Sequence, residues 1–311
     1  MDPAVTVIAE RTFGAAPDHV ERAEVGRLHE TYFVDVAGRA VVVQFASDRG
    51  GGVDSLRLGT SCYRLFRDTP VPVPEVLSDG VETHAGREYV VVERLPGEPA
   101  KLDISAARMR AAGRELARIH AYGPDFDVPG RLRFESDEPV VDPVFESDHR
   151  AWLLAELKDN LDTLREAGFD AVDAIAALFE DAGDRIPTDF EPVLCHDDFS
   201  PDNVLFEGDE LTGVIDFDRA YAGHDARDLV KAVNASWMHD PVTEWSVRES
   251  FYDGYRSVRP FPEGFGRVES LYRVESLVAP VAGMLEIGAF SDAEAAFYDD
   301  RLAQMIDDAR S

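Results

Sequence analysis

A histidine, an asparagine and two aspartates fall at short spacings within residues 193–220. His196 and Asp198 follow the apolar run VLC, Asn203 precedes VLF, and Asp216 follows GVI. Carboxylate and amide oxygens suit Mg²⁺, which takes one or two protein oxygens and completes its shell with phosphate and water. A carboxylate beside such a cation can accept a hydroxyl proton while the metal stabilises charge on a phosphoryl group. These residue types therefore favour phosphoryl-transfer chemistry.

A β-hairpin is expected to position two of these residues. The segment NVLFEGDELTGVID consists of two apolar runs around a turn at residues 208–209. A register symmetric about that turn pairs Leu205 with Val214 and brings Asn203 opposite Asp216. The two oxygen-bearing side chains would then meet at one end of a rigid ribbon.

Strands and tight turns are expected over the first hundred residues. The β-rich apolar segments are 19–27, 29–38, 39–47 and 87–99. A helix is expected over about 55–67, because the prolines of TPVPVP forbid its continuation. The Pro-Gly break at 96–97 is the predicted boundary between two domains, residues 1–96 and 97–311.

Helical spacing dominates the second of these domains. Helices are expected over 105–123, 148–169 and 170–186, and again from about residue 227 to the C-terminus. Residues 124–145, rich in Pro, Asp and Phe, are expected to form a long loop. The pattern predicts an α+β fold with a small β-rich N-terminal lobe and a larger, mainly helical C-terminal lobe.

The charge of the chain is strongly acidic. Its 311 residues include 61 acidic and 31 basic residues, for a net charge of −30, and only three of the basic residues are lysine. The acids are dispersed along the chain, and this composition resembles that of proteins from halophilic organisms, where salt screens the repulsion. The same acidity argues against binding to nucleic acid, which requires a basic face.

Membrane and secretory signals are not expected from this sequence. No apolar run approaches the roughly 20 residues of a membrane span, and the N-terminal residues lack the pattern of a secretory signal. Cys62 and Cys195 lie far apart in sequence and are expected to be small buried side chains in a reducing compartment. A cytoplasmic location is therefore predicted.

The spacing His196-x-Asp198-x4-Asn203, followed by Asp216 and Asp228, resembles the aminoglycoside phosphotransferase family. That family shares a protein-kinase-like fold and includes choline, homoserine and related small-molecule kinases. The phrases VPVPEVL, VVVERLPGE, ELARIH and FYDGY match the family in the same order. The resemblance therefore extends over most of the chain and implies a two-lobed, protein-kinase-like fold.

The resemblance also implies a role for each motif residue. Asp198 would be the catalytic base, and Asn203 and Asp216 would bind Mg²⁺. His196 would hold the catalytic loop by hydrogen bonds, and Asp228 would brace it from the following helix. ATP or GTP would be the co-substrate, and the acceptor would be a small molecule with a hydroxyl group, whose identity the sequence leaves open.

The nucleotide-binding residues depart from the family pattern. Glu93, Arg94 and Leu95 would form the hinge whose backbone pairs with adenine. Kinases of this fold usually place a Lys on the third strand and a Glu on the next helix. Here Gln44 stands in place of the Lys, and residues 51–70 contain no Glu.

Two arginines could neutralise the phosphates instead. Arg27 on the turn before the second strand and Arg57 on the first helix of that region are the candidates, and backbone amides near Gly26 could cover the phosphates. The missing Lys and Glu also favour an alternative, a non-catalytic nucleotide-binding protein of kinase-like fold. A metal-dependent phosphohydrolase is disfavoured, because a second set of metal ligands is not found.

Plainer interpretations remain for several neighbouring residues. Asp218 could be a water-linked metal contact or a solvated charge. His120, at the end of the helix over 105–123, is expected to be a packing residue. His196 is expected to be a buried histidine with satisfied hydrogen bonds and no role as a proton shuttle.

Overall fold

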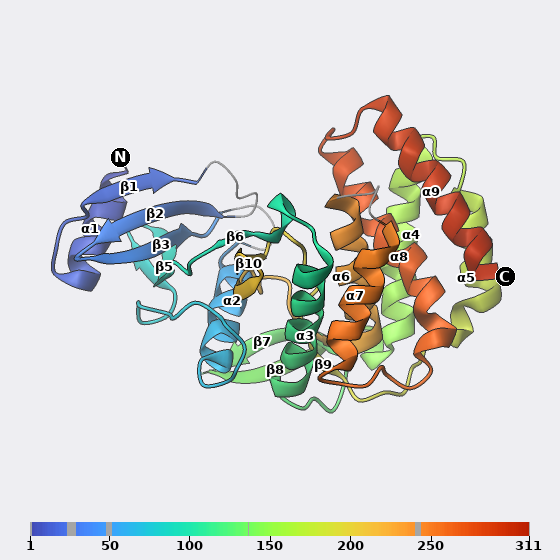
Figure 1. Cartoon of the computed structure of the whole chain (residues 1–311), viewed down its shortest axis with the longest axis horizontal. Coiled ribbons are helices and arrows are strands. Elements are labelled where there is room, and N and C mark those ends of the chain that lie inside the picture. The colour runs from blue at the N-terminus through green and yellow to red at the C-terminus, as the bar shows by residue number, and fades with distance from the viewer. Residues whose placement is uncertain (1, 24–28, 48–51, 136, 240–243, 311) are drawn as a thin grey trace. The chain divides into compact units, whose positions relative to one another are not determined.

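The computed structural model describes residues 2–23, 29–47, 52–135, 137–239 and 244–310. The chain divides into two compact units (Figure 1). The first comprises residues 1–103, 132–140 and 201–220, and the second comprises residues 104–131, 141–200 and 221–311. The predicted domain boundary at residues 96–97 stays a prediction.

The first unit contains most of the strands. Its elements are α1 (Pro3–Phe13), β1 (His19–Arg22), β2 (Glu30–Val36), β3 (Arg39–Phe45), α2 (Gly52–Phe66), β4 (Glu82–His84), β5 (Arg87–Glu93), β6 (Glu98–Pro99), the 3₁₀ helix η1 (Ala100–Leu102), β10 (Val204–Glu207) and β11 (Glu210–Val214). Strands β7 (Gly130–Glu135) and β8 (Glu138–Pro143) each have residues in both units.

An antiparallel five-stranded sheet in the order β1-β2-β3-β5-β4 forms the body of the first unit. Alternate residues of β2, β3 and β5, among them Val34, Val41 and Val91, pack with Val5 and Ile8 of α1 in a common apolar core. The side chains between them belong to the opposite face, because successive side chains of a strand point to opposite sides. Helix α2 contacts β5.

Most of the elements predicted for the first unit are present. The helix predicted over about 55–67 is confirmed as α2, and the four β-rich segments contain β1, β2, β3 and β5. Helix α1 lies outside the predicted elements, although Asp2 caps it by accepting a hydrogen bond from the Ala4 N–H, and Pro3 occupies its first turn. Many residues of this short helix are β-branched, and such residues favour strands, so the sequence gives no clear helix signal here.

The predicted hairpin is confirmed, but its predicted register is wrong. Strands β10 and β11 pair around a turn at residues 208–209. Val214 lies opposite Val204, not Leu205. Phe206 pairs with Leu211, so an unbroken ladder about this turn would place Leu205 opposite Thr212. A bulge between Leu205 and Phe206 moves the partner of Leu205 by one residue to Gly213, one short of the predicted Val214. Asn203 is therefore opposite Ile215, whose N–H donates to the Asn203 carbonyl (3.0 Å).

The second unit is largely helical. Its elements are α3 (Ala106–Tyr122), the 3₁₀ helix η2 (Phe145–Ser147), α4 (His149–Glu166), α5 (Val172–Ala182), the 3₁₀ helix η3 (Gly183–Arg185), β9 (Val193–Cys195), β12 (Tyr221–Gly223), α6 (Asp225–His239), α7 (Glu244–Arg256), α8 (Phe265–Glu286) and α9 (Asp292–Arg310). Strand β12 pairs with β9 and with the first residues of β7. Helix α3 packs on α7, and α8 packs on α4, α6 and α9.

The helix predicted over 105–123 is confirmed, and its caps are those the sequence indicates. The Ser105 side chain accepts from the N–H of Arg108, and Gly123 follows the last turn. The prediction of a long loop over 124–145 is wrong, because β7 and β8 lie within it. Residues 131–133 alternate polar and apolar side chains as a strand does, and the surrounding prolines obscure that pattern.

Two glycines set the crossing of α3 and α7. A methyl group added to Gly254 would lie 2.0 Å from the Arg110 carbonyl oxygen, and one added to Gly113 would lie 2.0 Å from the Phe251 carbonyl oxygen. Backbone therefore meets backbone at this crossing, and neither helix tolerates a side chain there. The glycine of the FYDGY segment, Gly254, therefore serves helix packing.

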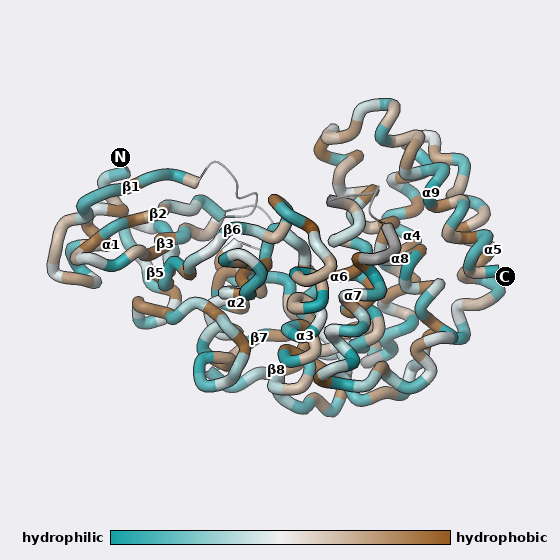
Figure 2. Tube along the Cα trace, in the orientation of Figure 1, coloured by the Kyte–Doolittle hydropathy of each residue, from teal (hydrophilic) through white to brown (hydrophobic). Residues whose placement is uncertain are grey.

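Apolar residues are interleaved with polar ones along each helix (Figure 2). None of the described helices is long and apolar enough to cross a membrane. Both cysteines are buried and unpaired.

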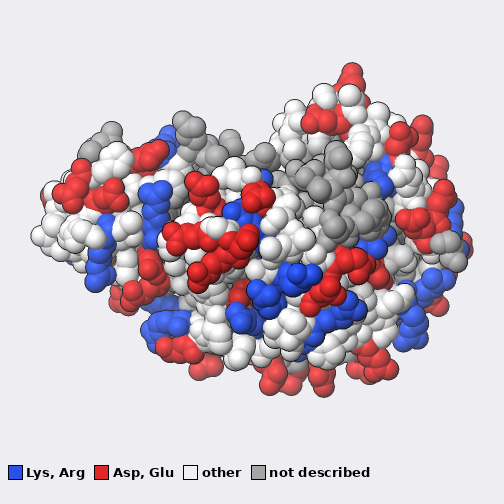
Figure 3. Space-filling view, in the orientation of Figure 1, with Lys and Arg blue, Asp and Glu red and all other residues white. Residues whose placement is uncertain are grey.

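Acidic residues are scattered over the face shown in Figure 3, with basic residues among them. The three lysines differ in their surroundings. Lys101 forms an ion pair with Asp202, whereas Lys158 is 74% exposed on α4 and reaches Asp162 one turn along (3.2 Å). Lys231 forms an ion pair with Asp197 and is 18% exposed.

Candidate active site

The motif segment of the second unit begins where a buried strand ends. Strand β9 pairs with β12, with Cys195 opposite Tyr221. His196 follows directly and is completely buried. Its Nδ1 accepts a hydrogen bond from the Asp198 N–H (3.3 Å), and its ring lies edge-on to Phe199. The histidine therefore fixes the backbone of the loop that carries Asp198.

Asp228 on α6 holds the same loop. Its two carboxylate oxygens accept hydrogen bonds from the N–H groups of His196 and Asp197, both at 2.9 Å, and one also contacts Nε2 of His120 at 3.1 Å. His120 is fixed in turn by the Tyr255 hydroxyl (2.8 Å). Burial alone would raise the pKa of Asp228, but the hydrogen bond and charge of His120 keep that pKa below its ordinary value. The carboxylate thus stays ionised and serves as an acceptor.

Asp197 has a left-handed backbone conformation (φ 63°), which turns the chain between His196 and Asp198. Its carboxylate accepts from Lys231 Nζ at 2.6 Å and from the Arg227 guanidinium at 3.3 Å. A charge next to the predicted base is thereby neutralised by two cations from α6.

Arg227 is itself part of a buried pair with α8. Its Nε and one terminal nitrogen contact the two carboxylate oxygens of Glu275, at 3.2 and 2.7 Å, and the other terminal nitrogen donates to the Tyr221 hydroxyl. The Arg227 and Glu275 side chains are 8% and 3% exposed. This bidentate pair fixes the cation that Asp197 uses.

The two predicted metal ligands both belong to the first unit. Asn203 is buried and immediately precedes β10, and Asp216 is half-buried two residues after β11. The bond between the Ile215 N–H and the Asn203 carbonyl ties the two ends of the hairpin together, although the side chains are not at opposite ladder positions. Asp198 belongs to the second unit.

One face of α2 fixes the segment that carries Asp216. The Tyr63 hydroxyl accepts a hydrogen bond from the Asp216 N–H (2.9 Å). Phe217 packs on the rings of Tyr63 and Phe66, with centroids 6.0 and 5.5 Å away. Burial and the carboxylate of Asp218 raise the pKa of Tyr63 far above its ordinary value, so the hydroxyl remains neutral. Asp216 adopts a left-handed conformation (φ 67°) at this anchor point.

The surroundings of Asp218 exclude one of the two interpretations that the sequence leaves open. Its side chain is 9% exposed, so it is not a solvated charge, and one carboxylate oxygen lies 2.5 Å from Nε2 of His29. A methyl group added to Gly59 of α2 would lie 2.1 Å from the other oxygen. The carboxylate therefore fills the space between α2 and His29.

The residues predicted to bind nucleotide lie on strands β3 and β5 and just beyond. Gln44 is half-buried on β3, opposite Thr31 of β2 and Val90 of β5. The Glu93 N–H donates to the Glu75 carbonyl and the Arg94 N–H to the Ala40 carbonyl, so both are already used within the unit. The Leu95 side chain would contact any side chain placed at Gly213 of β11.

The sequence also predicts three positions that could contact the phosphates: Gly26, Arg27 and Arg57. Gly26 and Arg27 lie outside the described residues. Arg57 is 59% exposed on α2 and lies 3.8 Å from Asp54.

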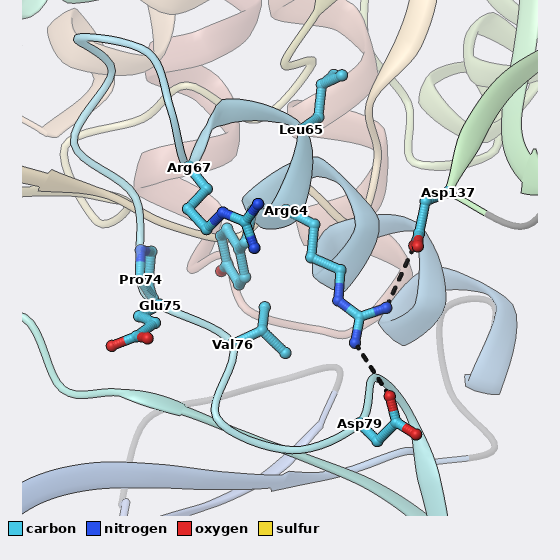
Figure 4. Close-up of a pocket in the computed structure, with 9 residues that line it drawn as sticks. Arg64, Leu65, Arg67, Pro74, Glu75, Val76, Asp79 and Asp137 are labelled. Atoms are coloured by element: carbon cyan, nitrogen blue, oxygen red, sulfur yellow. Dashed lines mark hydrogen bonds and ion pairs between the residues drawn. The ribbon is translucent and has the colours of Figure 1, made fainter.

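A separate cavity of about 380 Å³ lies at the end of α2 and along the segment after it (Figure 4). Arg64 points into it and is held by Asp137 (3.2 Å) and Asp79 (3.9 Å). None of the predicted site residues that the structure describes lines this cavity. Arg64 is already neutralised, and Arg67, which also lines the cavity, pairs with Asp68 (3.3 Å), so we assign the cavity no part in the chemistry.

Sequence reasoning missed several residues that support the site. His120 is more than the packing residue that the sequence predicts, because it contacts the Asp228 carboxylate. Tyr63 and His29 give no signal of their own, because a single tyrosine or histidine in a helix or turn has no characteristic spacing. Lys231 could have been found: it stands three residues after Asp228 in a chain with only three lysines.

The antiparallel N-terminal sheet with its helix, followed by a largely helical C-terminal portion, is the protein-kinase-like two-lobed fold. A solved structure of similar fold is a thermostable mutant of aminoglycoside phosphotransferase APH(4)-Ia in ternary complex with AMP-PNP and hygromycin B. Its TM-score is 0.70 with 19% sequence identity, and the match covers 98% of each chain. The chain belongs to the phosphotransferase enzyme family, which it matches over residues 19–261.

Curated relatives point to the same family. The homoserine kinase of Beijerinckia indica subsp. indica is 31% identical over 196 residues, which are 61% of this chain and 55% of that protein. The homoserine kinase of Phenylobacterium zucineum is 28% identical over 195 residues, which are 62% of this chain and 55% of that protein. The chain thus spans just over half the length of these curated relatives.

Proposed function

We propose that this protein is a Mg²⁺-dependent small-molecule kinase that transfers the γ-phosphoryl group of ATP to a hydroxyl group of its acceptor. The observation that carries the proposal is the fixed loop of Asp198. His196, Asp228 and their partners hold its backbone at several points, and the family match over residues 19–261 includes all of them. Such preorganisation supports catalysis, because phosphoryl transfer depends chiefly on positioning and electrostatics.

Asp198 would orient the acceptor hydroxyl and accept its proton as the new phosphate ester bond forms. Lys231 and Arg227 neutralise Asp197, so they reduce repulsion between this neighbouring carboxylate and the phosphates. ADP leaves with the electron pair of the broken bond to the γ-phosphorus.

The donor set of Asn203 and Asp216 fits Mg²⁺. An amide oxygen and a carboxylate are hard oxygen ligands, and Mg²⁺ commonly takes one or two of them beside phosphate and water. The Asn203 carbonyl is engaged by Ile215, and the Asp216 N–H is engaged by Tyr63, so the backbone at both ligands is fixed. When bound, Mg²⁺ would neutralise the phosphate oxygens.

The hinge would recognise the base through the backbone of Leu95. The N–H groups of Glu93 and Arg94 are already used, which favours the Leu95 N–H as the donor to adenine. Recognition through backbone groups does not separate ATP from GTP, so both are candidates.

A non-catalytic nucleotide-binding protein is the second candidate. It is favoured by Gln44 on β3 and by the lack of a Glu in α2, whose sequence is GVDSLRLGTSCYRLF. The acceptor of the enzyme also remains to be assigned. Homoserine, fructosamines and aminoglycosides enter the panel to screen because kinases of these compounds are among the relatives and similar structures. Choline enters it because the motif resembles a family that includes choline kinases.

The test combines nucleotide binding with turnover. ATP and GTP are titrated calorimetrically with and without Mg²⁺ in molar KCl, and nucleotide consumption is then followed with the acceptor panel. Asp198→Asn should lower turnover by about 10²- to 10⁴-fold, the usual contribution of a general base, and leave the Kd of Mg·ATP within a few-fold. Asp209→Asn in the exposed hairpin turn is the matched control. Binding of Mg·ATP without turnover of any acceptor would favour the non-catalytic alternative.

A further inference from the structure

Strand β3 and helix α2, both fully described, lack the residues of the ion pair that kinases of this fold use to join the sheet to the helix beside it. In such kinases a Lys on the third strand pairs with a Glu on that helix, and both must be in place for catalysis. Here β3 presents Gln44, and the only acidic residue of α2 is Asp54 in its first turn, with a side chain that is 87% exposed. Neither can take the place of its counterpart.

A different acid occupies the surface of α2. Gly59 lies near the middle of the helix, and the Asp218 carboxylate lies so close to it that a methyl group there would be 2.1 Å from one oxygen. The acid is therefore not a residue of α2 but belongs to residues 215–218, which pack against the helix. Gly59 of the helix leaves the space that the carboxylate occupies.

The partner of this acid is a histidine from the start of the sheet. His29 directly precedes β2, and its Nε2 lies 2.5 Å from Asp218 Oδ2, with the two side chains 5% and 9% exposed. A carboxylate accepts hydrogen bonds, so Nε2 carries the proton that is shared between them. Within the described part of the chain, Nδ1 of His29 is closed off from solvent and has no partner. Ser55 Oγ of α2 lies 3.4 Å from the same Nε2, so Asp218 is the closer of the two polar contacts of this ring.

The same segment touches α2 at two further points. Gly59, Tyr63 and Phe66 are spaced by four and three residues, so they share one face of the helix. They contact Asp218, the N–H of Asp216 and the ring of Phe217 respectively. A predicted metal ligand is thus anchored at its own N–H and is followed by two anchored residues, and His29 connects this arrangement to β2.

We propose that His29 and Asp218 form a positioning pair that takes the place of the missing Lys and Glu. The pair joins β2, α2 and residues 215–218, and thereby holds Asp216 in its metal-binding position. As in the Lys–Glu pair, the donor comes from the sheet side, but here it directly precedes β2, and the acid belongs to the metal-binding segment and not to α2. This inference rests on the proposed function, because positioning Asp216 matters for activity only if Asp216 binds Mg²⁺ beside a nucleotide.

Three variants test the pair. Asp218→Asn keeps the shape but removes the charge, His29→Leu removes the donor, and His29→Gln retains a polar donor. Exposed residues of the same unit supply matched controls, His19→Leu on β1 and Asp209→Asn in the hairpin turn. For every protein the measurements are the thermal unfolding midpoint, the Kd of ATP with and without Mg²⁺, and the Mg²⁺ dependence of turnover.

Supporting residues of a metal site typically alter metal affinity or activity about 10- to 100-fold. We expect Asp218→Asn and His29→Leu to raise the Mg²⁺ concentration for half-maximal turnover, and to weaken Mg²⁺-dependent ATP binding, by about that factor. Binding of ATP without Mg²⁺ should change little. His29→Gln should recover part of the loss in Mg²⁺ dependence. The double variant Asp218→Asn with His29→Leu should lose less than the product of the two single effects, because both substitutions break the same interaction. The controls should match the wild type.

The outcomes separate this inference from the proposed function. Equal Mg²⁺ dependence in wild type and variants, with comparable unfolding midpoints, would overturn the pair and leave the kinase intact. Wild-type protein that binds Mg·ATP without turnover would overturn the kinase, and the binding data would still decide the role of the pair. Wild-type protein that binds no nucleotide would overturn both.

Discussion

His149, at the start of α4, gives a quantitative prediction for the pH dependence of stability. Its side chain is 2% exposed, and its ring is surrounded by those of Phe190, Trp152 and His224, with centroids 5.2, 6.4 and 6.2 Å away. Neither ring nitrogen has a hydrogen-bond partner within the described part of the chain. Burial, with a smaller contribution from the charge of Arg227, lowers the pKa of His149 to about 3.

The sign follows from proton uptake. The unfolded state binds a proton near pH 6.5, whereas the folded state binds it only near pH 3, so the stabilising effect of a neutral His149 is fully present above pH 6.5 and is lost as the pH falls. Between those values the free energy of unfolding decreases by about 1 kcal/mol per pH unit, for a total of about 2–3 kcal/mol between pH 6.5 and 4.5. Phe has a similar shape and does not titrate, so His149→Phe should remove this contribution.

The assay is chemical denaturation of wild type and His149→Phe at half-unit steps from pH 7 to 4.5, in molar KCl. The free energy of unfolding of the wild type should fall about 2–3 kcal/mol further than that of the variant over this range. Glu115, whose pKa is raised to about 7 by burial, acts in the opposite direction, but it is present in both proteins and cancels. His19→Phe on the exposed β1 strand is the control. Parallel curves for wild type and His149→Phe would refute the reasoning.

Further predictions concern packing, a buried ion pair and salt. Gly254→Ala should destabilise the protein by about 1–3 kcal/mol, because its methyl group would meet the Arg110 carbonyl at 2.0 Å; denaturant melts should show Gly266→Ala, in open space on α8, to be neutral or slightly stabilising. Glu275→Ala should cost about 3–5 kcal/mol, since it leaves Arg227 buried without its bidentate partner, and a loss below about 1 kcal/mol in the same melts would contradict this. Transfer from 2 M to 0.1 M KCl should lower the thermal midpoint by roughly 10 °C, because the net charge of −30 is then unscreened; a midpoint independent of KCl would argue against adaptation to salt.

Local signals explain which elements the sequence could predict. The helix over 105–123 combines a capping serine, helical spacing and a terminal glycine, and all three agree with α3. The β10–β11 hairpin was equally visible from its turn residues. Its register was predicted incorrectly, because symmetry about residues 208–209 places Leu205 opposite Thr212 rather than Val214. The bulge at Leu205 and Phe206, which shifts the partner of Leu205 to Gly213, leaves no mark on the alternation of apolar residues.

In the candidate site, too, the sequence could predict local features but not contacts between distant segments. The spacing of Asp198, Asn203 and Asp216 is a property of one short stretch, so the sequence could identify it. The partners of these residues come from distant segments: His29 is 189 residues from Asp218, and His120 is 108 residues from Asp228. Such pairs depend on how the chain folds and have no local pattern.

The scarcity of lysine also means that a reagent that modifies amines has few lysine side chains to react with, and these differ in exposure. Lys101 and Lys231 are held by carboxylates and are 30% and 18% exposed, whereas Lys158 projects from α4 into solvent. An amine-directed dye or surface linker should therefore attach to α4 before it reaches the other two side chains. Among the lysines, one labelled side chain at a known position would follow from the composition of the chain, without any engineered cysteine.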